Sequence, residues 1–317
     1  MFSNHSNQNQ IFCLMGPTAA GKTALAIELT KHFPFDIISV DSAMVYRGMD
    51  IGTAKPTLAE LKVAPHRLIN ICDPAEAYSA GQFRQDAIAE IEKIFALGRV
   101  PLLVGGTMLY FRVLQQGISN LPQASKEIRA EIAGQIEKLG LEEIYRQLQK
   151  IDPQTTAVIK PTDSQRIGRA LEVFKLTGKK LSELKSASPP QKLPFKFINI
   201  AVAPLERLYL QNKINLRFRE MLRLGFIEEV EQLHKREDLH FDLPSIRTVG
   251  YRQAWQYFSC QITYDQMLQR IPIATRQLAK RQLTWLRSWS EVKWFDSESP
   301  QLIKYVTQLV ATSSILQ

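Results

Sequence analysis

The sequence contains no apolar run long enough to cross a membrane, and its start lacks the usual targeting patterns. No apolar stretch approaches the roughly 18 residues of a spanning helix. The first ten residues, MFSNHSNQNQ, include no basic residue and no apolar segment. We therefore expect neither a signal peptide nor a transit peptide there, only a frayed polar tail, and a protein without membrane association.

Cysteine is scarce. Only Cys13, Cys72 and Cys260 occur, far apart and without C-x-x-C spacing. This pattern argues against a zinc site and against a disulfide framework, and it fits a reducing cytosol. We therefore expect a cytoplasmic protein whose three cysteines are buried as small apolar side chains.

Acidic residues fall short of basic ones in only one half of the chain. Residues 1–160 carry 16 Lys and Arg against 16 Asp and Glu, whereas residues 161–317 carry 24 against 15, which accounts for the whole net charge of +9. No acid occurs from residue 266 to residue 290. The asymmetry favours a polyanionic partner for the second half, although a solvated basic surface would produce the same pattern.

Apolar content is ordinary for a globular enzyme. The chain is 45% hydrophobic and 22% charged, and its 317 residues suffice for one large domain or two smaller ones. In the first third, the runs IFCLM, DIISV, HRLINICD and VPLLVGG predict strands, and TALAIELTKHF and QFRQDAIAEIEKIFALG predict helices. This alternation predicts βαβ units, and hence an α/β fold whose parallel sheet has helices on both faces.

Consecutive helical patterns then interrupt the alternation. Apolar residues recur at helical spacing over 128–139 and over 141–151, and DSQRIGRALEVFKLTGKKLSEL predicts a further helix. The Ser/Pro-rich KSASPPQKLP predicts a connector, FKFINIAV a returning strand, and VKWF a last strand in a largely helical remainder. We therefore expect a core formed by residues 1–123 and 193–317, interrupted by a helical insertion domain over 124–192.

A phosphate-binding loop joins the first expected strand to the first expected helix. Gly16, Gly21, Lys22 and Thr23 complete the pattern G-x-x-x-x-G-K-[ST] in a strand–loop–helix context. The glycines let backbone N–H groups point at phosphate oxygens, and the helix adds the positive end of its dipole. Lys22 supplies a point charge, and the Thr23 hydroxyl is placed to bind Mg²⁺. The pattern predicts phosphate binding and leaves the reaction open.

The acid that usually supports Mg²⁺ at the end of a hydrophobic strand in an NTPase is missing. PLLVGGT ends in Gly105, Gly106 and Thr107, whereas DIISVD ends in Asp41. Parallel strands bring their carboxyl ends to one edge of a sheet, so we expect Asp41 and Thr107 to lie beside the phosphate loop. A carboxylate there can bind Mg²⁺, accept a proton from a nucleophile, or serve only as a helix cap or turn residue.

Six blocks carry a wider resemblance: GPTAAGKT, DSAMVYRGMDIGTAKP, GGTMLYFRVL, DSQRIGRALEVF, IRTVGYRQAW and TRQLAKRQLTWLR. In this order, over about residues 11–295, the chain closely resembles the tRNA dimethylallyltransferase (tRNA isopentenyltransferase) family. The resemblance implies a P-loop NTPase-like core that transfers a dimethylallyl group from dimethylallyl diphosphate to N6 of adenine 37, next to the anticodon of tRNA. The loop would then hold the donor's diphosphate, which is the leaving group.

The resemblance also implies roles for single residues. Asp41 would accept the proton of the attacking N6, and Thr107 would hydrogen-bond or seat the base. Arg217 and the loop would neutralise the diphosphate, with Mg²⁺ on Thr23. The loop residues are Gly16, Pro17, Thr18, Ala19, Ala20, Gly21, Lys22 and Thr23.

Contacts with the anticodon stem-loop are implied at six places along the chain, where splayed bases and phosphates would be bound. For Trp285 the alternative is inward packing of its helix. The residues are Asp41, Ser42, Ala43, Met44, Thr107, Arg129, Gln165, Arg166, Ile167, Gly168, Arg169, Arg247, Thr248, Val249, Gly250, Tyr251, Arg252, Lys280, Arg281, Gln282, Leu283, Thr284, Trp285, Leu286 and Arg287.

Departures from the family pattern are small. Ala20 stands where serine is common, and Met44 stands where glutamine is frequent. No cysteine/histidine finger follows residue 295, which favours the bacterial type, and we expect a monomer. Three alternatives stay open: prenylation of free AMP, ADP or ATP, a P-loop kinase for a small metabolite, and a non-catalytic RNA-binding ATPase module. The kinase would leave the "GGT" at residues 105–107 without a role, and the ATPase module would leave Asp41 without one.

Overall fold

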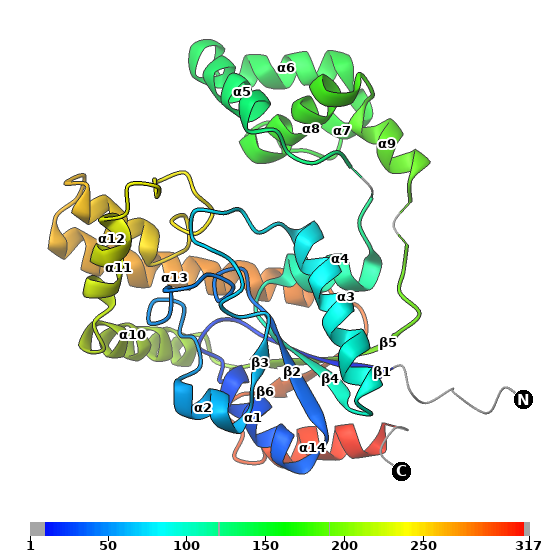
Figure 1. Ribbon diagram of the computed structural model, residues 1–317, viewed down its shortest axis with the longest axis vertical. Coiled ribbons are helices and arrows are strands. Elements are labelled where there is room, and N and C mark those ends of the chain that lie inside the picture. The colour runs from blue at the N-terminus through cyan, green and yellow to red at the C-terminus, as the bar shows by residue number, and fades with distance from the viewer. Residues whose placement is uncertain (1–9, 120, 190, 314–317) are drawn as a thin grey trace, which may run out of the picture. The chain divides into compact units, whose positions relative to one another are not determined.

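A parallel sheet forms the centre of the first of two structural units. In the computed structural model, which describes residues 10–119, 121–189 and 191–313, six strands form one sheet in the order β3-β2-β4-β1-β5-β6 (Figure 1). All five neighbouring pairs are parallel. The strands are β1 (Gln10–Met15), β2 (Phe35–Val40), β3 (His66–Arg67), β4 (Val100–Gly105), β5 (Lys196–Ala203) and β6 (Val292–Asp296). The expected polar tail at residues 1–9 lies outside the described residues.

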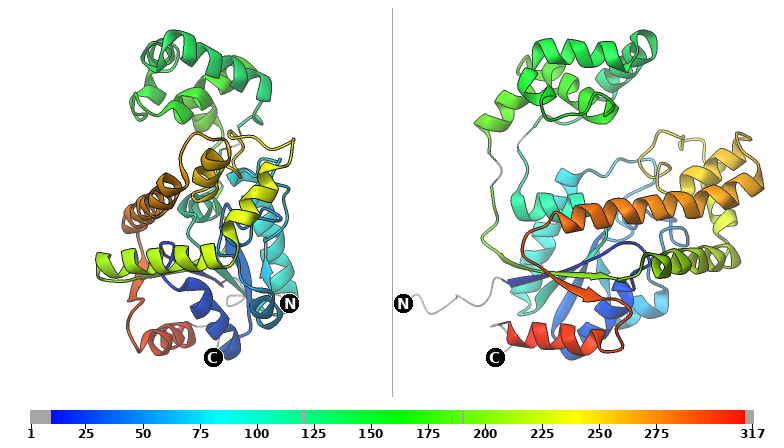
Figure 2. Two further views of the ribbon diagram at one scale, coloured as in Figure 1. Left: turned by 90° about the vertical axis from the view of Figure 1, so that its left-hand side faces the viewer. Right: turned by 180° about the vertical axis from the view of Figure 1, so that it is seen from behind.

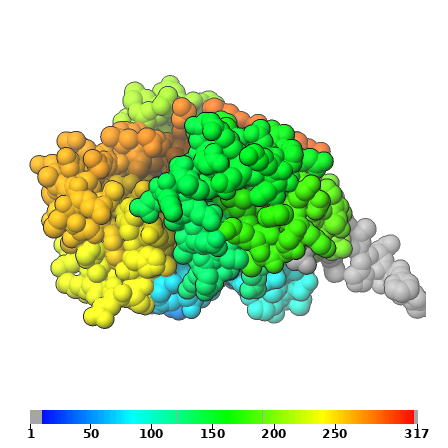
Figure 3. Space-filling model, turned by 90° about the horizontal axis from the view of Figure 1, so that it is seen from above, coloured from blue at the N-terminus to red at the C-terminus, as the bar shows by residue number. Residues whose placement is uncertain are grey.

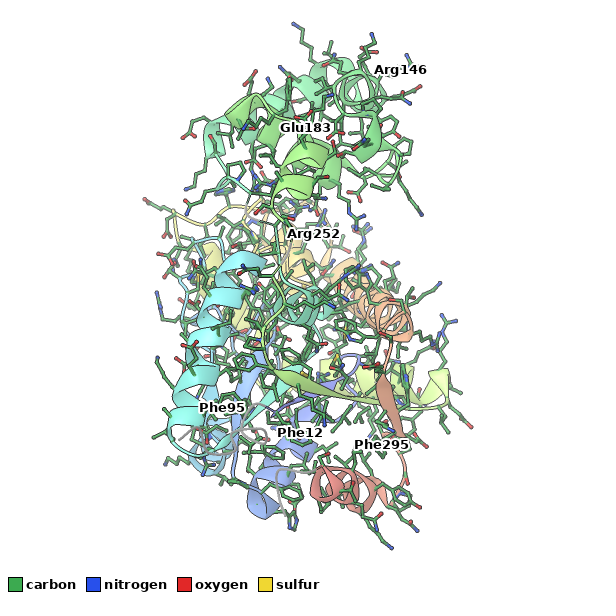
Figure 4. All side chains as sticks on the ribbon, turned by 90° about the vertical axis from the view of Figure 1, so that its right-hand side faces the viewer. Phe12, Phe95, Arg146, Glu183, Arg252 and Phe295 are labelled. Atoms are coloured by element: carbon green, nitrogen blue, oxygen red, sulfur yellow. The ribbon has the colours of Figure 1, made fainter. Side chains whose placement is uncertain are left out.

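Helices cover both faces of this sheet. Phe12 of β1 and Phe295 of β6, labelled in Figure 4, belong to one apolar cluster with α1 (Lys22–His32) and α14 (Leu302–Thr312). Helix α3 (Ala80–Ala96) packs against β2 and β4 from the other side, as the left view of Figure 2 shows. The prediction of an α/β fold with a parallel sheet covered on both faces is therefore confirmed.

A second apolar cluster lies beyond the carboxyl edge of the sheet. Helices α10 and α13 contact each other and run side by side (Figure 2), and α13 also contacts α12. Buried aromatic rings, among them Phe226 and Tyr251, fill the space between these helices and the loop that follows β2. The remaining helices of the first unit are α2 (Leu58–Val63), α4 (Met108–Gln116), α10 (Arg207–Arg223), α11 (Phe226–His234), α12 (Tyr251–Phe258) and α13 (Tyr264–Arg287).

The second unit, residues 116–193, is helical and has its own apolar core. Ile132, Ile144, Leu148 and Ile167 are buried there, while charged side chains such as Arg146 and Glu183 stay exposed (Figure 4). Its helices are α5 (Lys126–Leu139), α6 (Leu141–Ile151), α7 (Pro153–Thr156), α8 (Ser164–Thr177) and α9 (Leu181–Ala187). Among the described residues, no helix combines the length and apolar character needed to cross a bilayer.

Three local expectations were wrong. The single helix expected over 163–184 is two helices, because Gly178 adopts a left-handed conformation (φ 69°) that ends α8. The strand expected over 66–73 pairs only at His66 and Arg67, because Leu68 and Asn70 have positive φ angles that interrupt an extended chain. Cys13 and Cys72 are buried as expected, but Cys260 is exposed in the turn after α12.

Candidate active site

The phosphate loop leaves the N-terminus of α1 open to an anion. Gly21 caps the helix in a left-handed conformation (φ 77°) and supplies no side chain to accept from the first backbone N–H groups. The first turn contains no acidic residue. The Thr23 hydroxyl likewise makes no hydrogen bond with the described part of the chain. A phosphate at this point would receive unpaired N–H donors and the positive end of the helix dipole.

Two cations meet at this loop. Lys22 Nζ donates to the carbonyl oxygen of Pro17 at 2.7 Å, and Arg217 Nη1 of α10 donates to Thr18 Oγ1 at 3.2 Å. Burial, reinforced by the charge of Arg217, lowers the pKa of Lys22 to about 7, although Asp41 opposes this shift. Burial also lowers the pKa of Arg217. Neither cation forms an ion pair with any described residue. An anion bound between them would therefore offset the free-energy cost of holding two buried positive charges close together.

Gln282 of α13 connects the phosphate loop to the end of β4. Its Oε1 accepts from the backbone N–H of Thr18, and its Nε2 donates to the carbonyl oxygen of Gly106, both at 2.9 Å. The sequence resemblance implies that Gln282 contacts RNA. In the structure both ends of its amide hold the phosphate loop and the end of β4 together, a role that no local sequence pattern signals because Thr18 is 264 residues away.

Asp41 and Thr107 lie side by side at this edge. β2 and β4 are neighbours in register (Val40 pairs with Gly105), and the Thr107 N–H donates to the Val40 carbonyl oxygen at 3.2 Å. Thr107 Oγ1 accepts from the Ser42 N–H at 3.0 Å. Asp41 Oδ1 accepts from the N–H groups of Ala43 at 2.8 Å and Met44 at 3.3 Å, so the turn role considered from the sequence is present. Within the described residues, Asp41 Oδ2 accepts no hydrogen bond and stays available for chemistry.

A cavity of about 520 Å³ connects these groups. Its polar side includes Thr18, Asp41, Thr107 and Arg217, together with Ser42 and Ala43. Its apolar side, which the sequence analysis did not identify, comes from α10, α11 and α13: Ile214, Phe218, Met221, Phe226, Ile271 and Leu278. The helical pattern alone could not show these side chains as a wall, because periodicity does not tell which buried face borders a cavity. All lining residues belong to the first unit.

The candidate RNA residues of α13 divide between two sides of the helix. Arg281, Gln282 and Trp285 line this cavity, and Trp285 lies beneath the Arg112 guanidinium (5.7 Å to the ring centroid) instead of packing into the core. Lys280, Leu283, Thr284 and Arg287 line a second cavity of about 570 Å³ with α10 and β6. Leu286 is fully buried, so its side chain is not accessible to RNA.

The segment 247–252 borders the active-site cavity before α12 begins. Arg247, Thr248, Val249 and Gly250 line the cavity, and Arg252 is exposed above the ring of Phe241 (Figure 4). Figure 3 shows α12 and α13 as adjoining parts of one surface. The Tyr251 side chain is fully buried, so it belongs to the core and not to an RNA-facing surface.

In the second unit the candidate arginines are engaged within the protein. Arg129 Nε and Arg169 Nη1 donate to the buried carboxylate of Glu172 at 2.9 and 2.5 Å. Arg166 pairs with Asp163 at 3.3 Å, and Gln165 is exposed. Ile167 is fully buried in the core of this unit and Gly168 lies beside Ile132, so neither presents an accessible side chain.

Metal ligands are few. The described residues contain no group of three or more His, Cys, Asp or Glu side chains that could hold a metal ion. The Thr23 hydroxyl, in the first turn of α1, is the candidate protein ligand beside the loop. A single hydroxyl suits Mg²⁺ only when substrate phosphates supply most of its ligands.

Comparisons with known proteins agree on one family. A family model described as IPP transferase matches residues 44–289. The tRNA isopentenylpyrophosphate transferase of Bacillus halodurans is 34% identical, with 96% of both chains covered and a TM-score of 0.71. That of Staphylococcus epidermidis is 31% identical, with 96% of this chain and 100% of the other covered and a TM-score of 0.68.

A third structure extends the likeness to a eukaryotic protein. It shows a eukaryotic dimethylallyltransferase acting on tRNA, 25% identical over 96% of this chain and 78% of the other, with a TM-score of 0.79. With the family model covering most of the chain and two relatives above 30% identity over nearly its full length, this chain belongs to the IPP transferase family.

Proposed function

We propose that this chain transfers the dimethylallyl group of dimethylallyl diphosphate to N6 of adenine 37 in tRNA, which yields N6-(dimethylallyl)adenosine and diphosphate. One observation carries the proposal. At the carboxyl edge of the sheet, Lys22 and Arg217 form no ion pair with any described residue, and Asp41 Oδ2 accepts no hydrogen bond from one. A departing diphosphate needs cations beside it, and a nucleophile that loses a proton needs a carboxylate on the opposite side of the reacting carbon.

The leaving group would bind at the loop. Lys22, Arg217 and the open N-terminus of α1 provide the positive charge that a departing diphosphate requires. The C1–O bond of the donor breaks with both electrons going to the diphosphate. Because an allylic carbon supports positive charge, most stabilisation is needed on the diphosphate oxygens, where these groups lie.

The acceptor would meet Asp41 and Thr107. N6 attacks C1 with its lone pair, and its proton passes to Asp41 Oδ2, while Oδ1 stays bound to the turn that fixes the carboxylate. Thr107 would hydrogen-bond the base. The apolar wall formed by Ile214, Phe218 and Ile271 would shield the dimethylallyl group and exclude water from the cation-like carbon.

Mg²⁺ is part of the proposal. The Thr23 hydroxyl would be its protein ligand, and diphosphate oxygens would complete its coordination. When bound, the metal supplies further charge neutralisation to the leaving group.

The anticodon stem-loop would be bound by exposed polar and basic residues from each unit. Arg247, Arg252, Lys280 and Arg281 in the first unit are exposed, and so are Gln165 and Arg166 in the second. We also propose that the protein acts as a monomer.

Transfer of label tests the function directly. The protein is mixed with Mg²⁺, radiolabelled dimethylallyl diphosphate and either an unmodified anticodon stem-loop with adenine at position 37 or AMP. Label in the stem-loop, lost when that adenine is replaced by guanine, is the expected result. Label in AMP alone would assign the enzyme to free-nucleotide prenylation, and label in neither with ATP consumed would assign it to the kinases or ATPases. Omission of Mg²⁺ with a chelator present should abolish transfer.

A further inference from the structure

Glu229, in the first turn of α11, binds three consecutive backbone amides of a distant loop. Its Oε2 accepts from the N–H groups of Asp50 at 2.8 Å and Ile51 at 2.7 Å, and its Oε1 accepts from that of Gly52 at 3.0 Å. Successive N–H groups that converge on one carboxylate form an anion-binding nest, and hydrogen bonds to a charged acceptor are the stronger kind. The carboxylate therefore fixes the position of the loop over 50–52.

The same carboxylate also holds the start of α12. The Tyr251 hydroxyl donates to Glu229 Oε1 at 2.5 Å, and burial beside this carboxylate raises the pKa of Tyr251 well above its ordinary value, so the hydroxyl keeps its proton. Tyr251 directly follows the segment 248–250, which lines the active-site cavity. Glu229 thus joins two separate wall segments, 52–53 and 248–250, from behind.

Packing against two aromatic rings restricts the position of the loop over 50–52 further once Glu229 is bound to it. A Cβ atom added to Gly52 would lie 2.5 Å from Phe226 and 2.6 Å from Tyr251, so the loop backbone lies directly against these two rings. The rings themselves meet edge to face, with centroids 5.5 Å apart. On the other side, the buried ammonium of Lys55 donates to the carbonyl oxygen of Tyr46 at 2.8 Å and thereby anchors the far end of the same loop.

Glu229 itself is not among the residues that line the cavity. The hydrogen bonds that organise the donor side, made by Thr18, Gln282 and Arg217, involve neither of the two wall segments. The loop over 52–53 follows closely on Asp41, Ser42 and Ala43, which also border the cavity. Loss of the Glu229 contacts should therefore move the walls on the acceptor side and leave the diphosphate site in place.

We propose that Glu229 is a positioning residue for the acceptor nucleotide: it sets the spacing of the wall segments 52–53 and 248–250 between which the target base is held. This inference rests on the proposed prenyl transfer to tRNA. It assigns Glu229 an effect on acceptor binding and on the alignment of N6, without contact to either substrate.

The test compares Glu229→Gln with Glu228→Gln by steady-state transfer to the stem-loop. Glu228 is the matched control, because it occupies the same helical turn but is exposed. The amide of Glu229→Gln places an NH₂ group against backbone N–H donors. We expect its KM for the stem-loop to rise about tenfold or more, the worth of a hydrogen bond to a charged group, with the KM for the donor within about twofold of wild type.

A role in stability alone predicts a different result. A partly unfolded enzyme loses kcat in proportion to its inactive fraction, while both KM values stay unchanged. Tyr251→Phe serves as a second variant if Glu229→Gln does not fold, because it removes one donor and keeps the ring; its stem-loop KM should rise in the same direction by a smaller factor. An unchanged stem-loop KM in both variants, or equal rises in both KM values, would overturn the inference. Absence of transfer by the wild-type protein would instead refute the proposed function.

Discussion

The ammonium group of Lys22 should couple diphosphate binding to proton uptake. Burial and the neighbouring charge of Arg217 lower the pKa of Lys22 to about 7, from an ordinary value of 10.5. A bound diphosphate brings negative charge to this group and should restore its pKa toward the ordinary value. At a pH above the lowered pKa, each binding event must then take up a proton.

The magnitude follows from linkage. If the pKa moves from about 7 in the free protein to 10.5 in the complex, the apparent dissociation constant becomes about 50-fold larger at pH 9 than at pH 7. At about pH 8, where roughly nine-tenths of the free Lys22 is neutral, about 0.9 proton is taken up for each diphosphate bound. The sign is fixed by the depressed pKa: binding weakens as the pH rises.

Isothermal titration calorimetry measures this uptake directly, from the difference in apparent enthalpy between two buffers of unlike ionisation enthalpy. Lys22→Arg is the matched control, because its guanidinium stays charged across the range and any protonation of the diphosphate itself is common to both proteins. Equal proton uptake by Lys22→Arg and the wild type, or no uptake by the wild type at all, would refute the assignment of Lys22 as the titrating group.

Four further results are expected. Asp41→Asn, which keeps an acceptor for the turn, should lower single-turnover transfer by roughly 10²–10⁴ while stem-loop affinity stays within a few-fold. Lys280→Ala combined with Arg281→Ala should weaken stem-loop binding and reduce the slope of log K against log salt by about 2, measured by fluorescence anisotropy. Gln282→Leu leaves a backbone donor and an acceptor unpaired, so urea unfolding should show a loss of about 1–3 kcal/mol. Between the folded and unfolded pKa values of Lys22, the unfolded chain binds more protons at this residue than the ligand-free folded protein does. The unfolding free energy should therefore rise from about pH 7 to pH 10, and Lys22→Met should reduce this rise.

The parts of the site that the sequence predicted are those built by short-range chain geometry. The strand, the loop and the helix at residues 10–32 are consecutive, so their local pattern predicts the loop that we propose binds the diphosphate. Asp41 and Thr107 could be placed together because a parallel sheet brings strand ends to one edge, and β2 and β4 prove to be neighbours. The break at Gly178 could also have been predicted, since a glycine after a basic last turn is a common helix stop.

The long-range hydrogen bonds of the site correspond to no local sequence pattern. Gln282 and Glu229 stand in ordinary amphipathic helices, and nothing in their neighbours shows that one binds Thr18 and the other the loop over 50–52. The second unit gives a similar case. Arg129 and Arg169 were expected to contact RNA because the family resemblance implies it, but the buried Glu172 that binds both could only be recognised once the two helices were packed.

The absence of an acid at the end of β4 has a steric cause, and this cause bears on the reaction. A Cβ atom on Gly105 would lie 2.0 Å from the backbone carbonyl oxygen of Val40, so this position accepts no side chain. A Cβ atom on Gly106 would lie 2.4 Å from Gln282 Nε2 and would displace the Gln282 side chain. The strand end that carries an acid in many NTPases is here packed against its neighbours, and the carboxylate lies one strand away, at Asp41 directly after β2. A carboxylate displaced in this way, with one oxygen fixed by a turn and the other free, is better placed to take a proton from an incoming nucleophile than to support a metal at the phosphate loop. The same loop that serves phosphoryl transfer elsewhere thereby suits a reaction in which diphosphate only departs.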